Sequence, residues 1–391
     1  MRDFSFTQLH KDKKTQARTG VIHTPHGDIR TPAFVPCGTQ ATVKSLTPDE
    51  LDTIGVQLFF VNTYHMYLRP GIGVVKKAGG LHKFMNWNGP IMTDSGGFQI
   101  FYLAKKASLV KISDEGVEFQ SHWDGTKHLF TPESSMRWQS ALGGDMHIAF
   151  DDCTPYGVSH EKARLSMERT HRWAQRSLAE HKKLHKKNIV LKTPYQALYG
   201  SIQGSVFKDL RQESAKFISG MDFDGIAIGG VSVGESKKQM VDVLDWVTPV
   251  LPDDKPRHLL GVGEIDDIFT LVEHGIDTFD CVQPTRLARM GTVLVGNNPI
   301  NQLANTPIKK HELDITNTRY AKDFGPIEKD CSCYTCTHFT RAYLHHLFHV
   351  KELLGYRLAT IHNLHFIHRL VDDIRESIQD HSFLELKRSW I

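Results

Sequence analysis

Short apolar runs alternate with longer segments of helical periodicity along most of the chain, and this alternation constrains the fold more than any other feature. Each run ends in a polar or glycine-containing turn, and segments such as Pro132–Leu142 and Glu161–Ala179 have helical spacing. Strands that alternate with helices build parallel sheets, and eight such units close a barrel. We therefore predict an α/β fold, a (β/α)8 TIM barrel with strands at Ala33–Val35, Leu58–Val61, Ile91–Met92, His147–Phe150, Ala197–Ile202, Gly225–Ile228, His258–Val262 and Thr278–Val282.

The chain is longer than a barrel of this type needs. It has 391 residues, whereas such a barrel typically takes about 250. With 40% hydrophobic and 23% charged residues, the composition excludes disordered, collagen-like and coiled-coil chains. Residues 297–326 are polar and rich in turns, and a cysteine cluster follows them. We expect a single TIM-barrel catalytic domain over residues 1–391 that contains an insertion over residues 297–370.

The segment before the first run, residues 20–32 (GVIHTPHGDIRTP), has the pattern of a β-hairpin. We expect its turn at His26-Gly27-Asp28, because glycine and aspartate accept the backbone conformations of tight turns. This hairpin would cover the bottom of the barrel.

No part of the chain has the pattern of a membrane anchor or a signal peptide. The most apolar stretch, Val56–Val61, is far shorter than the roughly 18 residues of a membrane span, and the N-terminus lacks an apolar core. We therefore expect a cytosolic protein, in which the six cysteines are thiols or metal ligands and not disulfides.

Three of the cysteines, Cys331, Cys333 and Cys336, lie within six residues. Thiolates at this spacing can bind one Zn²⁺, and a structural zinc site takes four Cys or His ligands in a tetrahedron. We therefore predict one structural Zn²⁺ per chain in the insertion. Spacing alone does not select the fourth ligand, for which the candidates are His338, His345, His346, His349 and His362.

Polar residues and glycines lie at or just after the ends of several predicted strands, on the side where barrel enzymes carry their active sites. They are Asp94, Asp151, Asp152, Gln203, Gly229, Gly230 and Asp280. Asp152 has the position of an N-cap for the next helix. Asp280 lies inside an apolar run, where a carboxylate is costly unless it is paired or used.

Two carboxylates on a barrel rim, with glycines that allow close approach of a flat ligand, favour cleavage at an anomeric carbon. In the retaining mechanism one carboxylate attacks and the other transfers the proton. Both a glycoside hydrolase and an N-glycosyl transferase fit this pattern, although few of the six Trp lie near the strand ends where a sugar cleft needs them.

Basic residues concentrate between His160 and Lys192, with ten Lys or Arg against three Glu. Such a block is either a solvated helical face or a surface for a polyanion, since Lys and Arg dominate nucleic-acid affinity. The overall net charge of +3 does not distinguish the two.

Six segments, in order, resemble the tRNA-guanine transglycosylases, and most closely their bacterial branch. The resemblance covers about Phe6 to Leu386. The segments are M-T-D-S-G-G-F-Q from Met92, F-D-D-C-T-P from Phe150, I-Q-G-S-V from Ile202, I-G-G-V-S-V-G-E from Ile228, F-D-C-V-Q-P-T-R from Phe279, and C-S-C-Y-T-C followed by T-I-H-N from Thr360.

This resemblance implies an enzyme, usually a homodimer, that exchanges guanine at the wobble position (34) of tRNAs with GUN anticodons (Asp, Asn, His, Tyr). The incoming base is the 7-deazaguanine preQ1, used for queuosine. It also implies that Asp280 is the nucleophile on ribose C1′ in a covalent double displacement, and that Asp94 is the general acid/base. The T-I-H-N match selects His362 as the fourth zinc ligand.

The resemblance further implies a base pocket and an RNA contact. Phe98 and Leu260 would stack on the base, where Tyr and Met are common in the family, and Arg286 and Arg289 would contact the anticodon strand. The other pocket residues would be Asp94, Asp151, Cys153, Gln203, Gly230 and Val231. The usual G-G-L-A-V-G-E reads G-G-V-S-V-G-E here, beside the 7-substituent, and the usual P-T-R-S-G-R reads P-T-R-L-A-R.

Three alternatives remain. A salvage enzyme would take queuine, which carries an added ring, but the queuine-using eukaryotic branch typically has Val and Gly at the positions of Cys153 and Val233. A non-catalytic tRNA-binding partner subunit is disfavoured because Asp94 and Asp280 are both present. A carbohydrate-directed glycosidase is disfavoured by the zinc module and the basic segment.

Overall fold

The computed structural model describes residues 4–100, 110–296 and 311–391. The first part of the predicted insertion, residues 297–310, lies outside the described residues.

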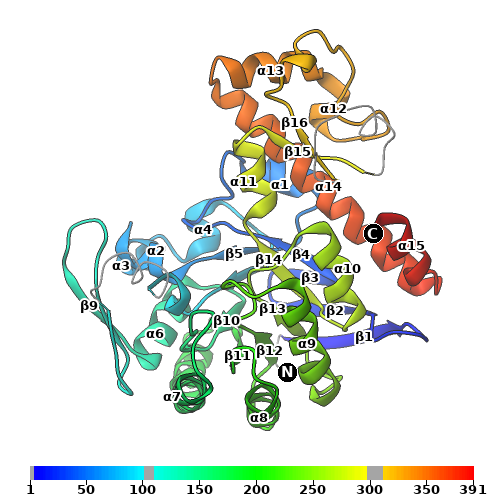
Figure 1. The fold of residues 1–391 in the computed structure, drawn as a ribbon. Helices are drawn as coiled ribbons and strands as arrows, with labels where there is room; N and C mark the ends of the chain where they lie inside the picture. The colour runs from blue at the N-terminus through cyan, green and yellow to red at the C-terminus, as the bar shows by residue number, and fades with distance from the viewer. Residues whose placement is uncertain (1–3, 101–109, 297–310) are drawn as a thin grey trace.

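Eight parallel strands form the centre of the molecule (Figure 1). Each strand pairs with its neighbour in chain order, and β4 pairs with β14. The ring is completed by a parallel bridge between Cys37 and Phe60, where the Gly38 N–H donates to the Phe60 carbonyl at 2.7 Å. The predicted α/β barrel is therefore confirmed, with strands β4 (Ala33–Pro36), β5 (Phe59–Val61), β6 (Ile91–Thr93), β10 (Met146–Ile148), β11 (Ala197–Ile202), β12 (Gly225–Ile228), β13 (Arg257–Leu259) and β14 (Thr278–Cys281).

Helices follow the strands and pack outside them, where they share one large apolar core with the outward-facing strand residues. The described helices are α1 (Pro48–Ile54), α2 (Thr63–Leu68), α3 (Ile72–Lys77), α4 (Leu81–Met85), α6 (Pro132–Leu142), α7 (His160–Val190), α8 (Lys208–Ser219), α9 (Lys237–Val247), α10 (Ile265–Glu273), α11 (Gln283–Arg289), α12 (Tyr334–His338), α13 (Arg341–His349), α14 (Leu353–Gln379) and α15 (Phe383–Trp390). None of these described helices is both long enough and apolar enough to cross a membrane.

The predicted hairpin is present and is part of a three-stranded antiparallel sheet of β1 (Ser5–Lys11), β2 (Arg18–Thr24) and β3 (Gly27–Thr31). Its predicted turn is wrong by one residue, because Thr24 pairs with Gly27 and the turn is therefore Pro25-His26. Ile22 and Ile29 pack into the cluster inside the barrel. The hairpin thus covers the end at which the strands begin, as expected.

The N-cap expected at Asp152 is wrong. The cap of α7 is Ser159, whose hydroxyl accepts the Lys162 N–H. Asp152 instead forms an ion pair with Arg169 at 2.5 Å. A buried carboxylate close to a guanidinium gains more from that pair than from a helix end seven residues further along.

Helix α7 contains nearly all of the basic segment, and many of its cations are paired with acidic side chains of neighbouring elements. The pairs are Arg164 with Asp209 and Glu213, Arg169 with Asp114 and Asp152, Arg172 with Asp114, Arg176 with Glu133, and Lys182 with Asp222. These contacts favour the solvated helical face over the polyanion surface.

Two smaller sheets extend from the barrel. β7 (Lys111–Ile112), β8 (Val117–Gln120) and β9 (Lys127–Phe130) follow β6, and β15 (Thr292–Leu294) pairs with β16 (Glu312–Asp314) after β14. The β15–β16 pair, α12 and α13 share an apolar cluster with Cys331, Cys333 and Cys336. Helix α14 contacts both α12 and α13 and then β4, so it connects this unit to the barrel (Figure 1).

Candidate active site and metal centre

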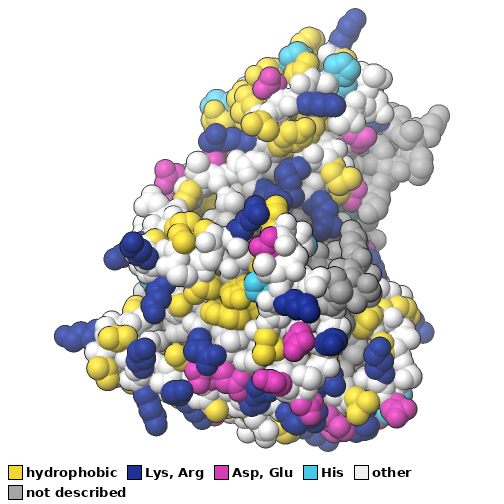
Figure 2. Space-filling view, turned by 90° about the vertical axis from the view of Figure 1, so that its left-hand side faces the viewer, with side chains coloured by type: hydrophobic (Ala, Val, Ile, Leu, Met, Phe, Trp, Pro, Cys, Tyr) yellow, Lys and Arg dark blue, Asp and Glu magenta, His cyan; other side chains and the backbone are white. Residues whose placement is uncertain are grey.

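The carboxyl ends of the barrel strands open on the side opposite the β1–β3 sheet, at the left of Figure 1. Figure 2 looks onto this side, where Lys and Arg side chains lie around a region of apolar side chains. The predicted site residues Asp94, Gln203 and Leu260 directly follow strands that end here, and Asp151 and Gly230 lie within three residues of such strand ends. Asp280 is the second-to-last residue of β14.

Asp280 is nearly buried and its two carboxylate oxygens differ in their partners. Oδ1 accepts the Gly261 N–H at 3.1 Å and lies 3.2 Å from His258 Nε2. Among the residues that the structure describes, Oδ2 has a single donor, the thiol of Cys37, with Sγ at 3.5 Å. Because a thiol is a weak donor, Oδ2 keeps most of its nucleophilic character, and the bonds to Oδ1 hold the carboxylate in place.

His258 is completely buried and has its own fixed partners. Its Nδ1 lies 2.9 Å from the Thr278 hydroxyl, and its ring stacks on Phe60. With the Thr278 hydroxyl as donor to Nδ1, the ring proton sits on Nε2 and is donated to Asp280.

Asp94 is held by four donors. The backbone N–H groups of Thr63 and Gly96 donate to Oδ1 at 2.8 and 3.1 Å, and the side-chain amides of Asn62 and Gln99 donate to Oδ2 at 2.5 and 2.7 Å. Burial nevertheless raises the pKa of Asp94 to about 6, and the hydrogen bonds only partly oppose this. A carboxyl group with that pKa can give and take a proton near neutral pH.

Asp151 and Gln203 form a second polar group next to Asp94. Gln203 Nε2 donates to Asp151 Oδ2 at 2.7 Å, and the Ser95 hydroxyl donates to Oδ1 at 3.4 Å. Burial raises the pKa of Asp151 to about 6, and the negative charge of Asp94 contributes to this shift. The two carboxylates are therefore close enough to influence each other.

Cys37 is close enough to both Asp280 and Asp94 to be affected by their charges, so the two carboxylates belong to one site. Burial raises the pKa of the Cys37 thiol well above its usual value, and the charges of Asp280 and, more weakly, Asp94 raise it further. Cys153 is buried beside the charge of Asp151, and burial raises its pKa as well. Both thiols therefore stay protonated.

The remaining predicted pocket residues differ in exposure. Phe98 is 43% exposed and Val231 is buried, whereas Leu260 packs partly against the cluster inside the barrel. Gly230 has a φ of +64°, and a Cβ atom there would lie 2.6 Å from Gln203 Oε1. Only glycine therefore lets the backbone approach the Gln203 amide this closely.

Arg286 and Arg289 lie on α11, directly after β14. Arg286 is exposed. Burial lowers the pKa of Arg289, and the charge of Arg286 lowers it further. Neither arginine forms an ion pair with a carboxylate in the described part of the chain. Two like charges without an acidic partner favour an anionic ligand at this position.

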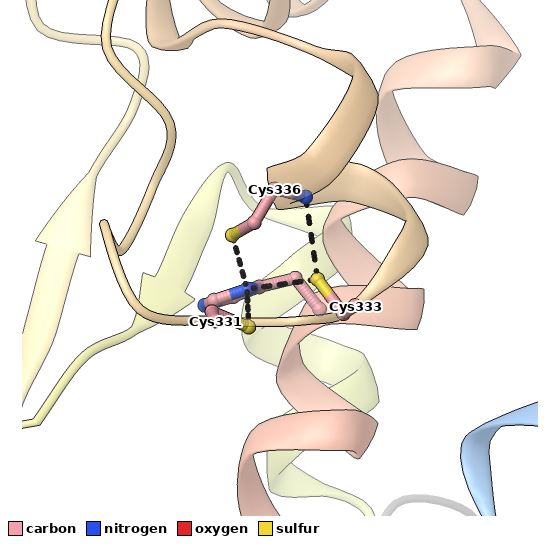
Figure 3. Close-up of side chains that lie close together, drawn as sticks. Cys331, Cys333 and Cys336 are labelled. Carbon is pink, nitrogen blue, oxygen red and sulfur yellow. Dashed lines mark hydrogen bonds between the residues drawn. The ribbon is translucent and has the colours of Figure 1, made fainter.

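The three predicted cysteines lie together and their sulfur atoms point toward one another (Figure 3). His362 Nδ1 lies 3.8, 3.5 and 3.3 Å from the sulfurs of Cys331, Cys333 and Cys336. In a tetrahedral site with metal bonds of about 2.3 Å to sulfur and 2.0 Å to nitrogen, a sulfur and a nitrogen ligand atom lie about 3.5 Å apart. The four residues can therefore hold a metal ion.

The other nitrogen of His362 supports this assignment. Nε2 donates to the Leu294 carbonyl at 2.7 Å, which leaves Nδ1 without a proton and able to bind a metal. Of the other candidate ligands, His338 is bonded to the Tyr334 carbonyl and His345 to the Ile315 carbonyl. The sequence did not single out His365, whose Nδ1 is 3.7 Å from Cys331 Sγ.

A second group, His26, His82 and Asp145, also brings three possible ligands together, at the base of the barrel. The two imidazole rings stack with centroids 3.6 Å apart and 16° between their planes. A metal ion cannot lie in two parallel ring planes at once, so it cannot meet both in-plane lone pairs. The group is a hydrogen-bonded cluster in which His26 Nδ1 lies 2.6 Å from Asp145.

The main contacts of the two central carboxylates come from residues that sequence reasoning missed. Asn62 and Gln99 bind Asp94, and Cys37 and His258 bind Asp280. Asn62 follows β5 as Asp94 follows β6, so the same positional rule could have found it.

Because burial raises the pKa of Asp151, its ionised form destabilises the folded protein. A neutral side chain at this position should remove that cost. The folded protein holds the Asp151 proton up to about pH 6 instead of 3.8, so stability is lost as the pH rises through 6. We expect Asp151→Asn to raise the free energy of unfolding by about 1–3 kcal/mol at pH 8, and by less at pH 5. Urea titrations at both pH values measure this, with Asp222→Asn at an exposed ion pair as the control. A gain that is absent, or larger at pH 5, would contradict the account.

The metal centre predicts a definite pattern of metal loss. We expect elemental analysis to find about one metal ion per chain, and Cys333→Ala and His362→Ala to lose it and to destabilise the C-terminal unit, because binding such an ion contributes folding free energy. His349→Ala is the matched control and should keep the ion. The reverse result for the two histidines would show that the fourth ligand is wrong.

Comparison with known proteins agrees with this geometry. The family model described as queuine tRNA-ribosyltransferase matches residues 12–391. A queuine tRNA-ribosyltransferase of Desulforamulus reducens is 50% identical over 381 residues, which cover 97% of this chain and 96% of the relative. One of Thermoanaerobacter sp. is 48% identical over 390 residues, covering 100% and 97%, and one of Symbiobacterium thermophilum is 46% identical over 383 residues, covering 98% and 90%.

The barrel gathers three buried carboxylates at its open end, and the chain carries a Cys3His cluster that can hold a metal ion. Both features agree with the resemblance seen in the sequence. The chain belongs to the queuine tRNA-ribosyltransferase family, the tRNA-guanine transglycosylases.

Proposed function

We propose that this enzyme exchanges guanine at position 34 of tRNAs with GUN anticodons (Asp, Asn, His, Tyr) for preQ1, by double displacement through a covalent tRNA–Asp280 intermediate. The observation that carries the proposal is the pairing of unlike carboxyl groups. Asp280 has one oxygen whose donor, within the described ranges of the chain, is only a thiol, and Asp94 has a pKa of about 6. One suits nucleophilic attack and the other suits proton transfer.

In the first half-reaction, Asp280 Oδ2 attacks ribose C1′. The C1′–N9 bond breaks, its electron pair goes to the departing guanine, and the Asp94 carboxyl group gives that base a proton. In the second half, the Asp94 carboxylate takes the N9 proton of the incoming base, N9 attacks C1′, and the ester bond to Asp280 breaks. Two inversions retain the β-linkage.

The base pocket follows from the same arrangement. Asp151, Gln203 and the Gly230 backbone would bind the edge of the base, while Phe98 and Leu260 would stack on its two faces. Cys153 and Val231 would line the side that meets the 7-substituent. A base bound between these residues must be rotated out of the anticodon stack, as in other enzymes that act on bases.

The rest of the proposal concerns partners and organisation. Arg286 and Arg289 would contact the anticodon phosphates, and Cys331, Cys333, Cys336 and His362 would hold one structural Zn²⁺, the metal that such ligands usually bind. The metal unit would be the insertion over residues 297–370 of a single catalytic domain, 1–391. We further propose a cytoplasmic homodimer, supported by exposed apolar side chains on the metal unit: Tyr334, Tyr343, Val350, Leu353 and Leu354.

The release of guanine from tRNA tests the function. Unmodified tRNA labelled in guanine 34 should lose its label when guanine or preQ1 is added, and Asp94→Asn should slow this by about 10²–10⁴-fold. The matched control is Asp145→Asn, a carboxylate buried equally at the base of the barrel, whose rate per folded molecule should stay within a few-fold of wild type. Binding of tRNA without release of guanine would indicate a non-catalytic subunit, and activity on oligosaccharides alone a glycosidase.

The space around Val233 determines which incoming base fits, so the identity of that base can be tested by comparing preQ1 with queuine. Val233 is half-buried and its N–H donates to Glu235 at 2.8 Å, which holds the backbone that carries its branched side chain. The extra ring of queuine would meet a bulky side chain, at a cost of about 1–3 kcal/mol. We expect preQ1 to displace labelled guanine efficiently and queuine poorly, and Val233→Gly to improve queuine about tenfold or more.

Val231→Ala is the control for this test, because it enlarges the pocket without opening the same path. Efficient displacement by queuine but not by preQ1 in the wild-type enzyme would identify a queuine-salvaging transglycosylase instead.

A further inference from the structure

Arg211 is a buried cation next to the base pocket that no step above uses. It lies on α8 and its side chain is fully buried. No carboxylate forms an ion pair with it among the residues that the structure describes. Burial lowers its pKa to about 10, so the guanidinium remains charged at neutral pH. Burying a cation without an acidic partner costs folding free energy, so we expect Arg211 to have a function.

Within the described part of the chain, the hydrogen-bond partners of Arg211 are backbone carbonyls at or just after the ends of β11 and β12. Nε donates to Ser205 O at 2.7 Å, and Nη1 donates to Ile202 O at 3.2 Å and Gly229 O at 2.7 Å. Nη2 donates to Gly230 O at 2.7 Å. One guanidinium therefore binds the carbonyls of two consecutive peptide groups, those after Gly229 and Gly230.

This contact fixes the direction of two N–H groups. In a trans peptide the N–H points opposite to the C=O, so the N–H groups of Gly230 and Val231 point away from Arg211. Both residues are buried, and neither N–H has an acceptor within the described ranges 4–100, 110–296 and 311–391. Buried N–H groups rarely stay without a partner, so these two are available to an acceptor atom of a bound ligand.

We propose that Arg211 is a positioning residue that turns the Gly230 and Val231 N–H groups into an oxyanion-type site for the 6-oxo group of the base. The inference rests on the proposed function, because it takes the base to be guanine or a 7-deazaguanine. The cation also polarises both peptide groups, which strengthens their N–H groups as donors. When guanine departs, its electron pair spreads to this oxygen, so the site stabilises the transition state more than the ground state.

The test compares guanine with 2-aminopurine, which lacks the 6-oxo group, as free bases bound to the full-length enzyme. By equilibrium dialysis, wild type should prefer guanine, and Arg211→Lys, which cannot bridge two carbonyls, should reduce this preference about ten- to hundredfold. Single-turnover release of guanine from tRNA should fall about 10²-fold with little change in the KM for tRNA.

Arg18→Lys is the matched control. Arg18 is equally buried at the base of the barrel, where it is bonded to Asp277 and two carbonyls, so its replacement should lower the thermal midpoint but keep the preference for guanine. If Arg211→Lys weakens both bases equally, or neither, Arg211 is only a brace and the inference is wrong.

Hydrogen exchange in the wild-type enzyme gives a result even if the Arg211 variants do not fold. Guanine should slow exchange of the amides of residues 230 and 231, and 2-aminopurine should not. Equal protection by both bases would overturn the inference. Because these are binding measurements, they separate the two proposals: guanine bound but not exchanged would refute the proposed function and leave this inference intact.

Discussion

A carboxylate removed from water is unstable as an anion unless donors or positive charges surround it. This free-energy cost determines which residues must surround the carboxylates at the open end of the barrel. Asp94, Asp151 and Asp280 are all nearly buried there. Each has a different set of partners: four donors for Asp94, an amide and a hydroxyl for Asp151, and a histidine, a backbone N–H and a thiol for Asp280. The same burial raises the pKa of Asp94 to about 6, so the proposed proton transfer depends on it.

The metal unit is connected to this site through two adjacent residues of α14. His362 faces the three cysteines and donates to Leu294 O, while the Asn363 side chain accepts from Leu294 N and donates to Pro284 O and Thr292 O. Pro284 lies on α11, which also carries Arg286 and Arg289. The Cys3His cluster is thereby linked to the helix that follows Asp280, so a metal ion bound there would help to fix the position of the two arginines.

The strands could be predicted because each one combines a short apolar run with a turn, but their ends could not. The run His258–Val262 continues past the end of β13 at Leu259 because Leu260 and Gly261 turn toward the site, Gly261 with a φ of +81°. The three cysteine ligands follow from spacing, whereas His362 required the resemblance, since a tetrahedron formed in space imposes no spacing along the chain. Arg211 left no signal at all, because its partners are backbone carbonyls, which any residue provides.

Peptide mapping detects the proposed covalent intermediate between tRNA and Asp280. Enzyme mixed with tRNA and a slow-reacting base is denatured and digested, and the protein fragments are examined by mass spectrometry for an attached ribonucleotide. We expect an ester on the peptide that contains Asp280, and we expect Asp280→Asn to lack this ester and to lose exchange. An adduct on another residue, or an Asp280→Asn enzyme that exchanges guanine at the wild-type rate, would contradict it.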